Sequence, residues 1–157
     1  MKLIQKVVLA LISFSCLFGC GSTSNNGNGI QGVTFLDKGA VVPNPVSTTV
    51  SIDSNSINYS QTQSGVNIGG WSKQIQFSDY TSIQKVIADN KLYEAGDVVS
   101  PGQPACTGAK GMTIKITNVN NVHPFDIDGG ILCDRTQWPV GVRDLVTLEE
   151  ALVVKYK

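Results

Sequence analysis

Met112-Thr113-Ile114-Lys115-Ile116-Thr117 is the stretch that decides the fold, because its apolar and polar residues alternate strictly. Such alternation is typical of a half-buried strand, with the apolar side chains on one face. Residues 122–127 follow after a turn at 118–121, and Pro124 within them indicates an edge strand. The two segments therefore predict an antiparallel hairpin with one face toward a core.

The first half of the chain repeats this pattern less regularly. The expected strands are residues 30–42 (weakly), 46–52 and 57–59 as a hairpin around the turn residues 53–56, and 71–77 as a half-buried strand. The polar, glycine-bearing span 60–70 predicts a loop, and so does the glycine- and proline-rich span 94–111.

Two segments have helical rather than strand periodicity. The first is expected to start at an N-cap at Ser78 or Asp79 and to run to about Asp89, with Asn90 as its stop. The second is expected over residues 139–155, with Pro139 in its first turn. Its apolar stripe contains Val142, Leu145, Val146, Leu148, Leu152, Val153 and Tyr156, and the opposite face is assigned Arg143, Asp144, Glu149 and Glu150.

The order of these elements predicts an α+β fold in a small two-layer domain. We expect an antiparallel sheet of about five strands with two helices packed on one face. The amphipathic stripe of each helix is interpreted as the surface that covers the sheet.

The N-terminus has the layout of a secretory signal. Lys2 and Lys6 precede an apolar run over residues 7–18 that only two serines interrupt. A membrane-spanning helix needs about 20 apolar residues, so this run is too short to span stably. Residues 1–19 are therefore expected to be removed from the mature protein.

Leu17-Phe18-Gly19-Cys20 resembles the lipobox of bacterial lipoproteins. The resemblance implies cleavage before Cys20 and a diacylglycerol on its sulfur, with the new amino group commonly acylated as well. Two or more acyl chains anchor a protein stably. By the sorting habit of that family, Gly21 in place of an aspartate implies the outer membrane, if the cell has two membranes. The membrane would thus be bound through the lipid on Cys20.

The composition after Cys20 suggests a tether followed by one domain. Residues 20–30 are rich in Gly, Ser, Thr and Asn and predict a flexible tether, and residues 31–157 are assigned to a single α+β domain. Without Lys2 and Lys6, 10 basic residues face 12 acidic ones, so the net charge is about −2. No basic stripe is present, which argues against nucleic acid as a partner.

Two of the four cysteines remain after the signal and the lipid are accounted for. Cys106 and Cys133 are expected to form a disulfide, because an exported chain meets an oxidising compartment. The bridge would close a loop of about 28 residues and contribute about 3.5 kcal/mol. A redox pair or a metal site is the alternative, but there is no Cys-x-x-Cys and only one histidine.

His123, Asp126 and Asp128 are the candidate catalytic or metal-binding residues. Two carboxylates two positions apart could bind calcium or act as acid and base, although turn chemistry explains Asp126-Ile127-Asp128-Gly129-Gly130 more simply. A small envelope hydrolase or a metal-binding protein that uses these residues is therefore the alternative function. No catalytic constellation and no cofactor motif is evident, so we expect a non-enzyme without a cofactor.

Arg135 and Trp138 form a candidate interaction surface, because arginine and tryptophan are enriched at protein interfaces. The sequence as a whole predicts a lipid-anchored cell-envelope protein. Its domain would be a non-enzymatic binding, structural or accessory domain, with an envelope protein as a candidate partner.

Overall fold

The structure is a computed structural model of the chain that describes residues 29–99 and 108–157. The predicted signal peptide, Cys20, nearly all of the expected tether and Cys106 lie outside the described residues.

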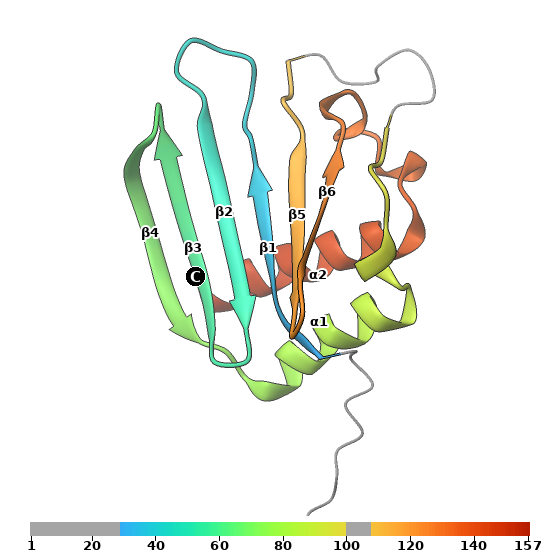
Figure 1. Ribbon diagram of the computed structural model, residues 1–157. Helices are drawn as coiled ribbons and strands as arrows, with labels where there is room; N and C mark the ends of the chain where they lie inside the picture. The colour runs from blue at the N-terminus through green and yellow to red at the C-terminus, as the bar shows by residue number, and fades with distance from the viewer. Residues whose placement is uncertain (1–28, 100–107) are drawn as a thin grey trace, which may run out of the picture.

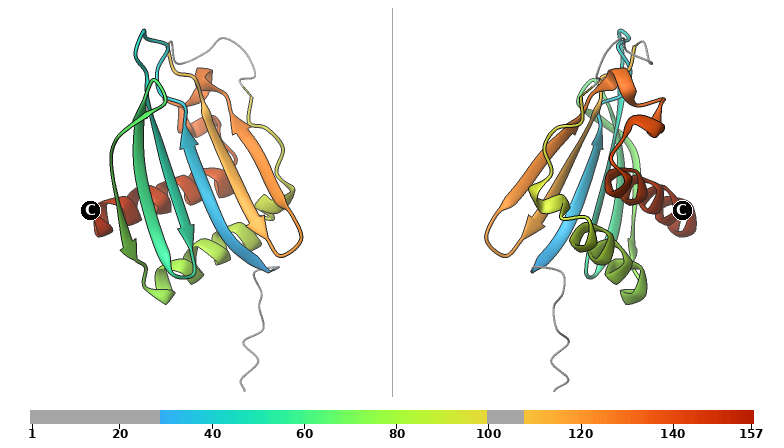
Figure 2. Two further views of the ribbon diagram at one scale, coloured as in Figure 1. Left: turned by 60° about the vertical axis from the view of Figure 1, so that its left-hand side comes forward. Right: turned by 90° about the vertical axis from the view of Figure 1, so that its right-hand side faces the viewer.

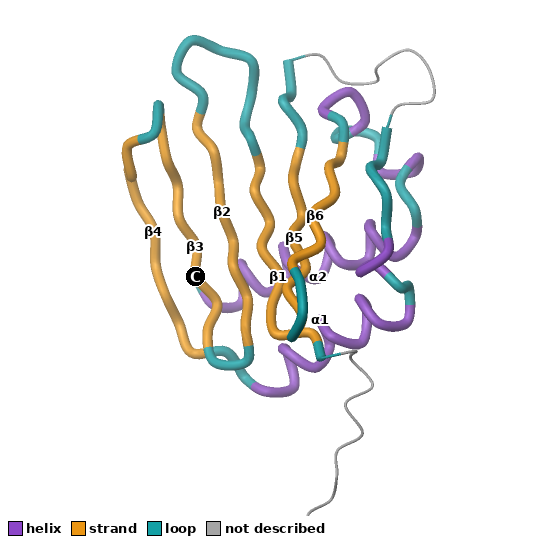
Figure 3. The backbone as a smooth tube through the Cα atoms, viewed as in Figure 1, coloured by secondary structure: helices purple, strands orange, loops and turns teal. Residues whose placement is uncertain are grey.

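Six strands form one antiparallel sheet in the order β4-β3-β2-β1-β5-β6 (Figures 1 and 3). The strands are β1 (Ile30–Asp37), β2 (Val46–Asp53), β3 (Ser56–Gln63), β4 (Val66–Gln74), β5 (Met112–Asn118) and β6 (Val122–Ile127). The helices are α1 (Phe77–Asp89) and α2 (Val140–Tyr156), with short 3₁₀ turns η1 (Leu92–Glu94), η2 (Gly129–Ile131) and η3 (Arg135–Gln137). After β4, α1 leads the chain back across the sheet, so that β5 pairs with β1.

The predicted α+β fold is confirmed, with six strands where about five were expected. Both helices pack on the same face of the sheet, which Figure 2 shows in its right-hand view. Among the described residues, no helix is long and apolar enough to cross a membrane.

The prediction of a loop at residues 60–70 is wrong. β3 continues to Gln63 and β4 starts at Val66, around a tight turn where Ser64 and Gly65 have positive φ angles. Alternation of apolar and polar residues marks a strand only where one face is buried. This end of the sheet is exposed on both faces, so its residues need no apolar period.

The two helices start close to where the sequence placed them. α1 begins at Phe77, with Gln76 as an N-cap that makes no side-chain capping bond, rather than with Ser78 or Asp79 as the cap. The Asp79 carboxylate instead accepts hydrogen bonds from Lys155 (2.7 Å) and the Tyr156 hydroxyl (2.5 Å) at the end of α2. This cluster joins the start of one helix to the end of the other.

The core lies between the helices and the inner face of the sheet. Alternate residues of the four middle strands and β6 supply its sheet side, among them Phe35, Ile52, Ile57, Ile114, Ile116 and Phe125. The helices contribute Tyr80, Ile83 and Ile87 from α1 and Val142, Leu145, Val146 and Leu152 from α2. Each of these side chains removes apolar area from water, at about 25 cal/mol per Å².

Glu149 was expected on the outer face of α2 but lies on its sheet-facing side, with 7 % of its surface exposed. It follows Leu145 by four residues and Val146 by three, which places it on their stripe. Burial raises the pKa of Glu149 to about 7, and the negative charges of Glu150 and Asp37 act in the same direction. The positive charge of Arg135 opposes the shift only in part.

Candidate functional site

A pocket of about 450 Å³ opens at the N-terminal end of β1. Its wall combines the start of β1, the β2–β3 turn, α1 and the β5–β6 turn, through Ile30, Gln31, Ser54, Phe77, Tyr80 and Gln84 with Gly29 and Val119. A volume of this size falls in the range of small-molecule binding sites. We refer to it as the β1-end pocket.

The main-chain carbonyl of Ile30 holds two side chains of the pocket lining. It accepts hydrogen bonds from the Tyr80 hydroxyl at 2.8 Å and from Nε2 of Gln84 at 2.9 Å. Burial, aided by the negative charge of Asp53, raises the pKa of Tyr80 above its ordinary value. Tyr80 therefore stays a neutral hydroxyl near pH 7 and holds α1 against β1.

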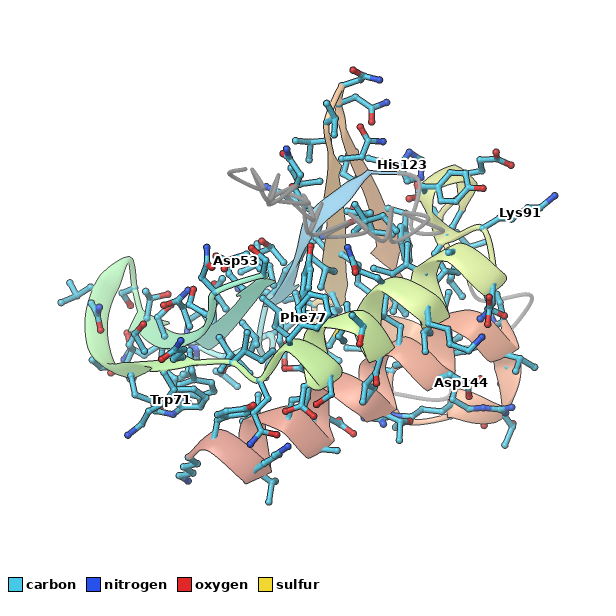
Figure 4. All side chains as sticks on the ribbon, turned by 90° about the horizontal axis from the view of Figure 1, so that it is seen from below. Asp53, Trp71, Phe77, Lys91, His123 and Asp144 are labelled. Carbon is cyan, nitrogen blue, oxygen red and sulfur yellow. The ribbon has the colours of Figure 1, made fainter. Side chains whose placement is uncertain are left out.

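Phe77 contributes an exposed apolar side chain to the β1-end pocket. Phe77 is the first residue of α1 and has 69 % of its surface exposed, an unusual position for a phenylalanine. Figure 4 views the molecule from this end and labels Phe77 and Asp53, with His123 well away from both. The aromatic ring at the mouth offers a ligand an apolar contact.

A second, shallower hollow of about 200 Å³ lies on the sheet face that no helix covers. Gln31 lines both hollows, so the two adjoin. Here the Thr34 and Ser51 hydroxyls are hydrogen-bonded at 3.2 Å. The Asp53 carboxylate accepts the main-chain N–H of Asn55 at 2.7 Å and of Ser56 at 2.9 Å, which fixes the β2–β3 turn.

The uncovered face as a whole is rich in hydroxyl and amide side chains. They occupy the positions that alternate with the core residues: Thr34 on β1, Thr49 and Ser51 on β2, Asn58 and Ser60 on β3, Ser72 on β4, and Thr113 and Thr117 on β5. Ser72 donates to Asn58 Oδ1 at 2.6 Å, and Asn58 donates to Ser56 Oγ at 2.9 Å. This surface suits hydrogen bonding to a polar ligand.

The predicted catalytic residues are not brought together. His123 makes a 2.7 Å hydrogen bond through Nε2 to the Ala95 carbonyl. Asp128 caps η2 by accepting the Gly130 N–H at 2.9 Å. Within the described ranges, no three or more His, Cys, Asp or Glu side chains are placed to hold a metal ion.

Asp126 lies on the uncovered face of β6, away from the β1-end pocket. Its carboxylate accepts a hydrogen bond from Thr113 and pairs with Lys38 Nζ at 3.1 Å. The hydrogen bond from Thr113 lowers the pKa of Asp126, and Lys38 adds a smaller effect in the same direction. Partial desolvation of the carboxylate opposes this shift. A carboxylate held ionised in this way is suited to a structural ion pair rather than to proton transfer near pH 7.

Of the predicted interaction pair, only Arg135 is at the surface. Trp138 is 4 % exposed and donates from Nε1 to the Ile131 carbonyl at 2.9 Å, so the assignment of Trp138 to a surface is wrong. Pro139 follows it directly as the N-cap of α2. Arg135 makes a two-pronged salt bridge to Glu150 and lies 5.3 Å from the Trp138 ring centre.

The cysteine predictions lie largely outside the described residues. Cys133 stands between η2 and η3. Cys106 and Cys20 fall outside the described ranges, so the Cys106–Cys133 disulfide and the lipid on Cys20 stay predictions.

The sequence offered little signal for the β1-end pocket. The sequence pattern predicts Tyr80 as a core residue of α1. Gln31 and Gln84 are ordinary polar residues at solvent-facing positions of a strand and a helix. They converge only because α1 crosses the sheet beneath the start of β1. Neither a protein-family model nor a curated protein matches this chain.

Proposed function

We propose that the chain is a lipid-anchored cell-envelope protein whose domain acts by binding, with the β1-end pocket as its site. The observation that carries the proposal is this pocket of about 450 Å³, whose lining combines apolar side chains with neutral polar groups. Ligand sites combine a mainly apolar wall with a few polar groups that fix orientation. Here Gln31 and Ser54 supply such groups beside Phe77.

The position of the pocket supports a role near the membrane. Gly29 lines the pocket and follows Cys20 by nine residues. Nine residues span at most about 30 Å when fully extended. A lipid on Cys20 would therefore keep the mouth of the pocket within that distance of the bilayer surface, where it could meet an envelope component.

The chemistry of the pocket favours an uncharged ligand. Tyr80 and the glutamines carry no charge near pH 7, and Asp53 is engaged by two main-chain N–H groups of its own turn. His123 and Asp128 are likewise held by separate main-chain bonds. These separate structural roles support a binding domain over a hydrolase built on those residues.

The lipid anchor is tested with the full chain expressed in a bacterial host. We expect the native chain in the membrane fraction with a mass increase that matches acylation, and Cys20→Ser in the soluble fraction without that increase. A native chain that is soluble and unacylated would refute the anchoring part of the proposal.

The binding site is tested with a photo-crosslinking amino acid in the full chain. The probe replaces Phe77 at the pocket mouth or, as a matched control, Val140, which is 58 % exposed at the start of α2. We expect a discrete adduct from position 77 that position 140 does not give, and at least a fivefold loss of that adduct in Gln31→Leu. Identical patterns from both positions would contradict a site at the pocket.

A further inference from the structure

β4 is the outermost strand of the sheet and is not buried anywhere along its length. Eight of its nine residues are exposed and Trp71 is half-buried. Val66 and Ile68 have 65 % and 52 % of their surfaces in solvent. Figures 1 and 3 show its outer side facing away from the rest of the domain.

The outer edge of β4 offers unpaired main-chain groups. Apart from the ladder with β3, the described residues give the β4 main chain one hydrogen bond, from the Gly69 N–H to Asn67 Oδ1 at 2.9 Å. Proteins usually protect such an edge with lysines, prolines or bulges, because it is a template for another strand. β4 has one lysine, Lys73, no proline, and one irregularity at Ile68, which leaves Gly69–Gln74 regular.

The two central glycines of β4 differ in what surrounds them. A Cβ on Gly70 would lie 2.5 Å from the Tyr59 carbonyl oxygen, so the fold itself requires glycine there. A Cβ on Gly69 would meet no atom within 4 Å. The position next to Gly69 is therefore open to an incoming group from outside the chain.

An aromatic pair marks the same point on the inner face. The rings of Tyr59 and Trp71 are stacked with centroids 5.5 Å apart and an angle of 9° between their planes. Trp71 is the last ring of this stack, at the sheet edge, and it remains half-exposed. A further aromatic ring would extend the stack across that edge.

We propose that β4 pairs edge to edge with β4 of a second copy of the chain. A two-fold axis perpendicular to the sheet, passing beside Gly70 or Trp71, makes the strands antiparallel and places the two Trp71 side chains on one face. With the axis beside Trp71, the two Trp71 side chains lie directly opposite each other. With the axis beside Gly70, each Trp71 lies opposite Gly69 of the copy and diagonally across from the other Trp71. Aromatic side chains can bridge both distances.

Charge and shape both favour a second copy as the occupant. Lys73 is the only charged residue of β4, and either register sets it opposite Asn67 or Gly69 of the copy instead of opposite the other Lys73. Like charges directly opposite each other would destabilise the pair. The open space at Gly69 accepts the ring of the copy's Trp71, a pairing in which an aromatic covers a strand glycine.

One strand edge with two aromatic rings buries less than a standard interface, so the dimer is expected to be weak in dilute solution. The pairing does not depend on the β1-end pocket. Confinement of both chains to one membrane would strengthen it by raising their effective concentration.

The experiment places a photo-crosslinking amino acid at Ile68 of the full chain in cells. We expect a chain-to-chain adduct of twice the chain mass from position 68. The same probe at Val122, exposed on β6 at the opposite edge of the sheet, should give at least tenfold less. A second probe position, Val66, should repeat the result of Ile68.

Three variants decide between explanations. Gly69→Lys should reduce the adduct at least fivefold, because it fills the space and adds charge at the pairing centre, while Val122→Lys should leave it unchanged. Cys20→Ser separates this proposal from the anchor, since a persisting adduct in the soluble variant shows pairing without membrane attachment. The proposal is overturned if position 68 yields no chain-to-chain adduct, if it reacts only with other proteins, or if folded Gly69→Lys crosslinks as the native chain does.

Discussion

The two edges of the sheet are built from the same antiparallel ladder but end differently. At the β6 edge, the Val98 N–H donates to the Asp126 carbonyl at 2.8 Å and the Val98 carbonyl accepts from Asp128 at 2.9 Å. The Asp97 carboxylate also accepts the Asp126 N–H at 2.8 Å. At the β4 edge, the described part of the chain supplies no such cover.

The two edges therefore differ in how much they stabilise the fold and in how open they are to a partner. β6 places Phe125 and Ile127 in the core, whereas β4 has no buried residue. Segments with few buried contacts open at low free energy, and binding surfaces tend to come from them. We expect the β6 edge to hold the fold together and the β4 edge to tolerate change.

The largest contrast is expected from the same substitution at the two edges. Val98→Asp places a charge at a site that is 8 % exposed and should lower the free energy of unfolding by about 3 kcal/mol. Val66→Asp, at 65 % exposure, should change it by less than about 0.5 kcal/mol. Urea denaturation of both variants measures the difference, and equal losses would show that the β6 edge is not the structural one.

A smaller contrast is expected within β4 itself. Gly70→Ala forces a Cβ against the Tyr59 carbonyl oxygen and should cost about 1–3 kcal/mol. Gly69→Ala meets open space and should be neutral or stabilise by up to about 1 kcal/mol. Thermal unfolding of the two variants gives the comparison. A loss in Gly69→Ala as large as in Gly70→Ala would place an unseen neighbour against Gly69 within the chain.

The smallest effect concerns the exposed ion pair on β6. The lowered pKa of Asp126 means that its ionised form stabilises the folded state above pH 4, and that this contribution disappears as the pH falls through the folded-state pKa. Asp126→Asn should lower the free energy of unfolding by about 0.5 kcal/mol at pH 7 and by almost nothing at pH 2. On β4, Lys73→Gln should show no such pH dependence, so the two titrations together test whether charge matters at one edge only.

The sequence predicted well where one face of an element is buried. The strict alternation of β5 and the apolar stripe of α2 gave both elements to within two residues, because burial forces a period on the side chains. The second half of β3 and the first half of β4, which fall in the expected loop at residues 60–70, escaped prediction for the opposite reason. Their polar residues on both faces satisfy hydrogen bonds but follow no period.

The candidate site was largely unpredictable from the sequence. Gln31 comes from β1, whereas Tyr80 and Gln84 come from α1, about 50 residues later in the chain. No local sequence pattern predicts that Tyr80 and Gln84 both donate to the Ile30 carbonyl. His123 and Asp128 attracted attention because their residue types are often catalytic. Their hydrogen bonds to main-chain groups give them structural roles.

Glu149 links folding of the domain to the acidity of its surroundings. Its pKa is about 7 in the folded chain against an ordinary value of 4.5, so between these pH values folding takes up a proton and unfolding releases it. The free energy of unfolding therefore falls as the pH rises across this window and changes no further above it. Calorimetry would register the released proton as an unfolding heat that varies with the ionisation heat of the buffer. Acidification across this window would thus stabilise the folded state.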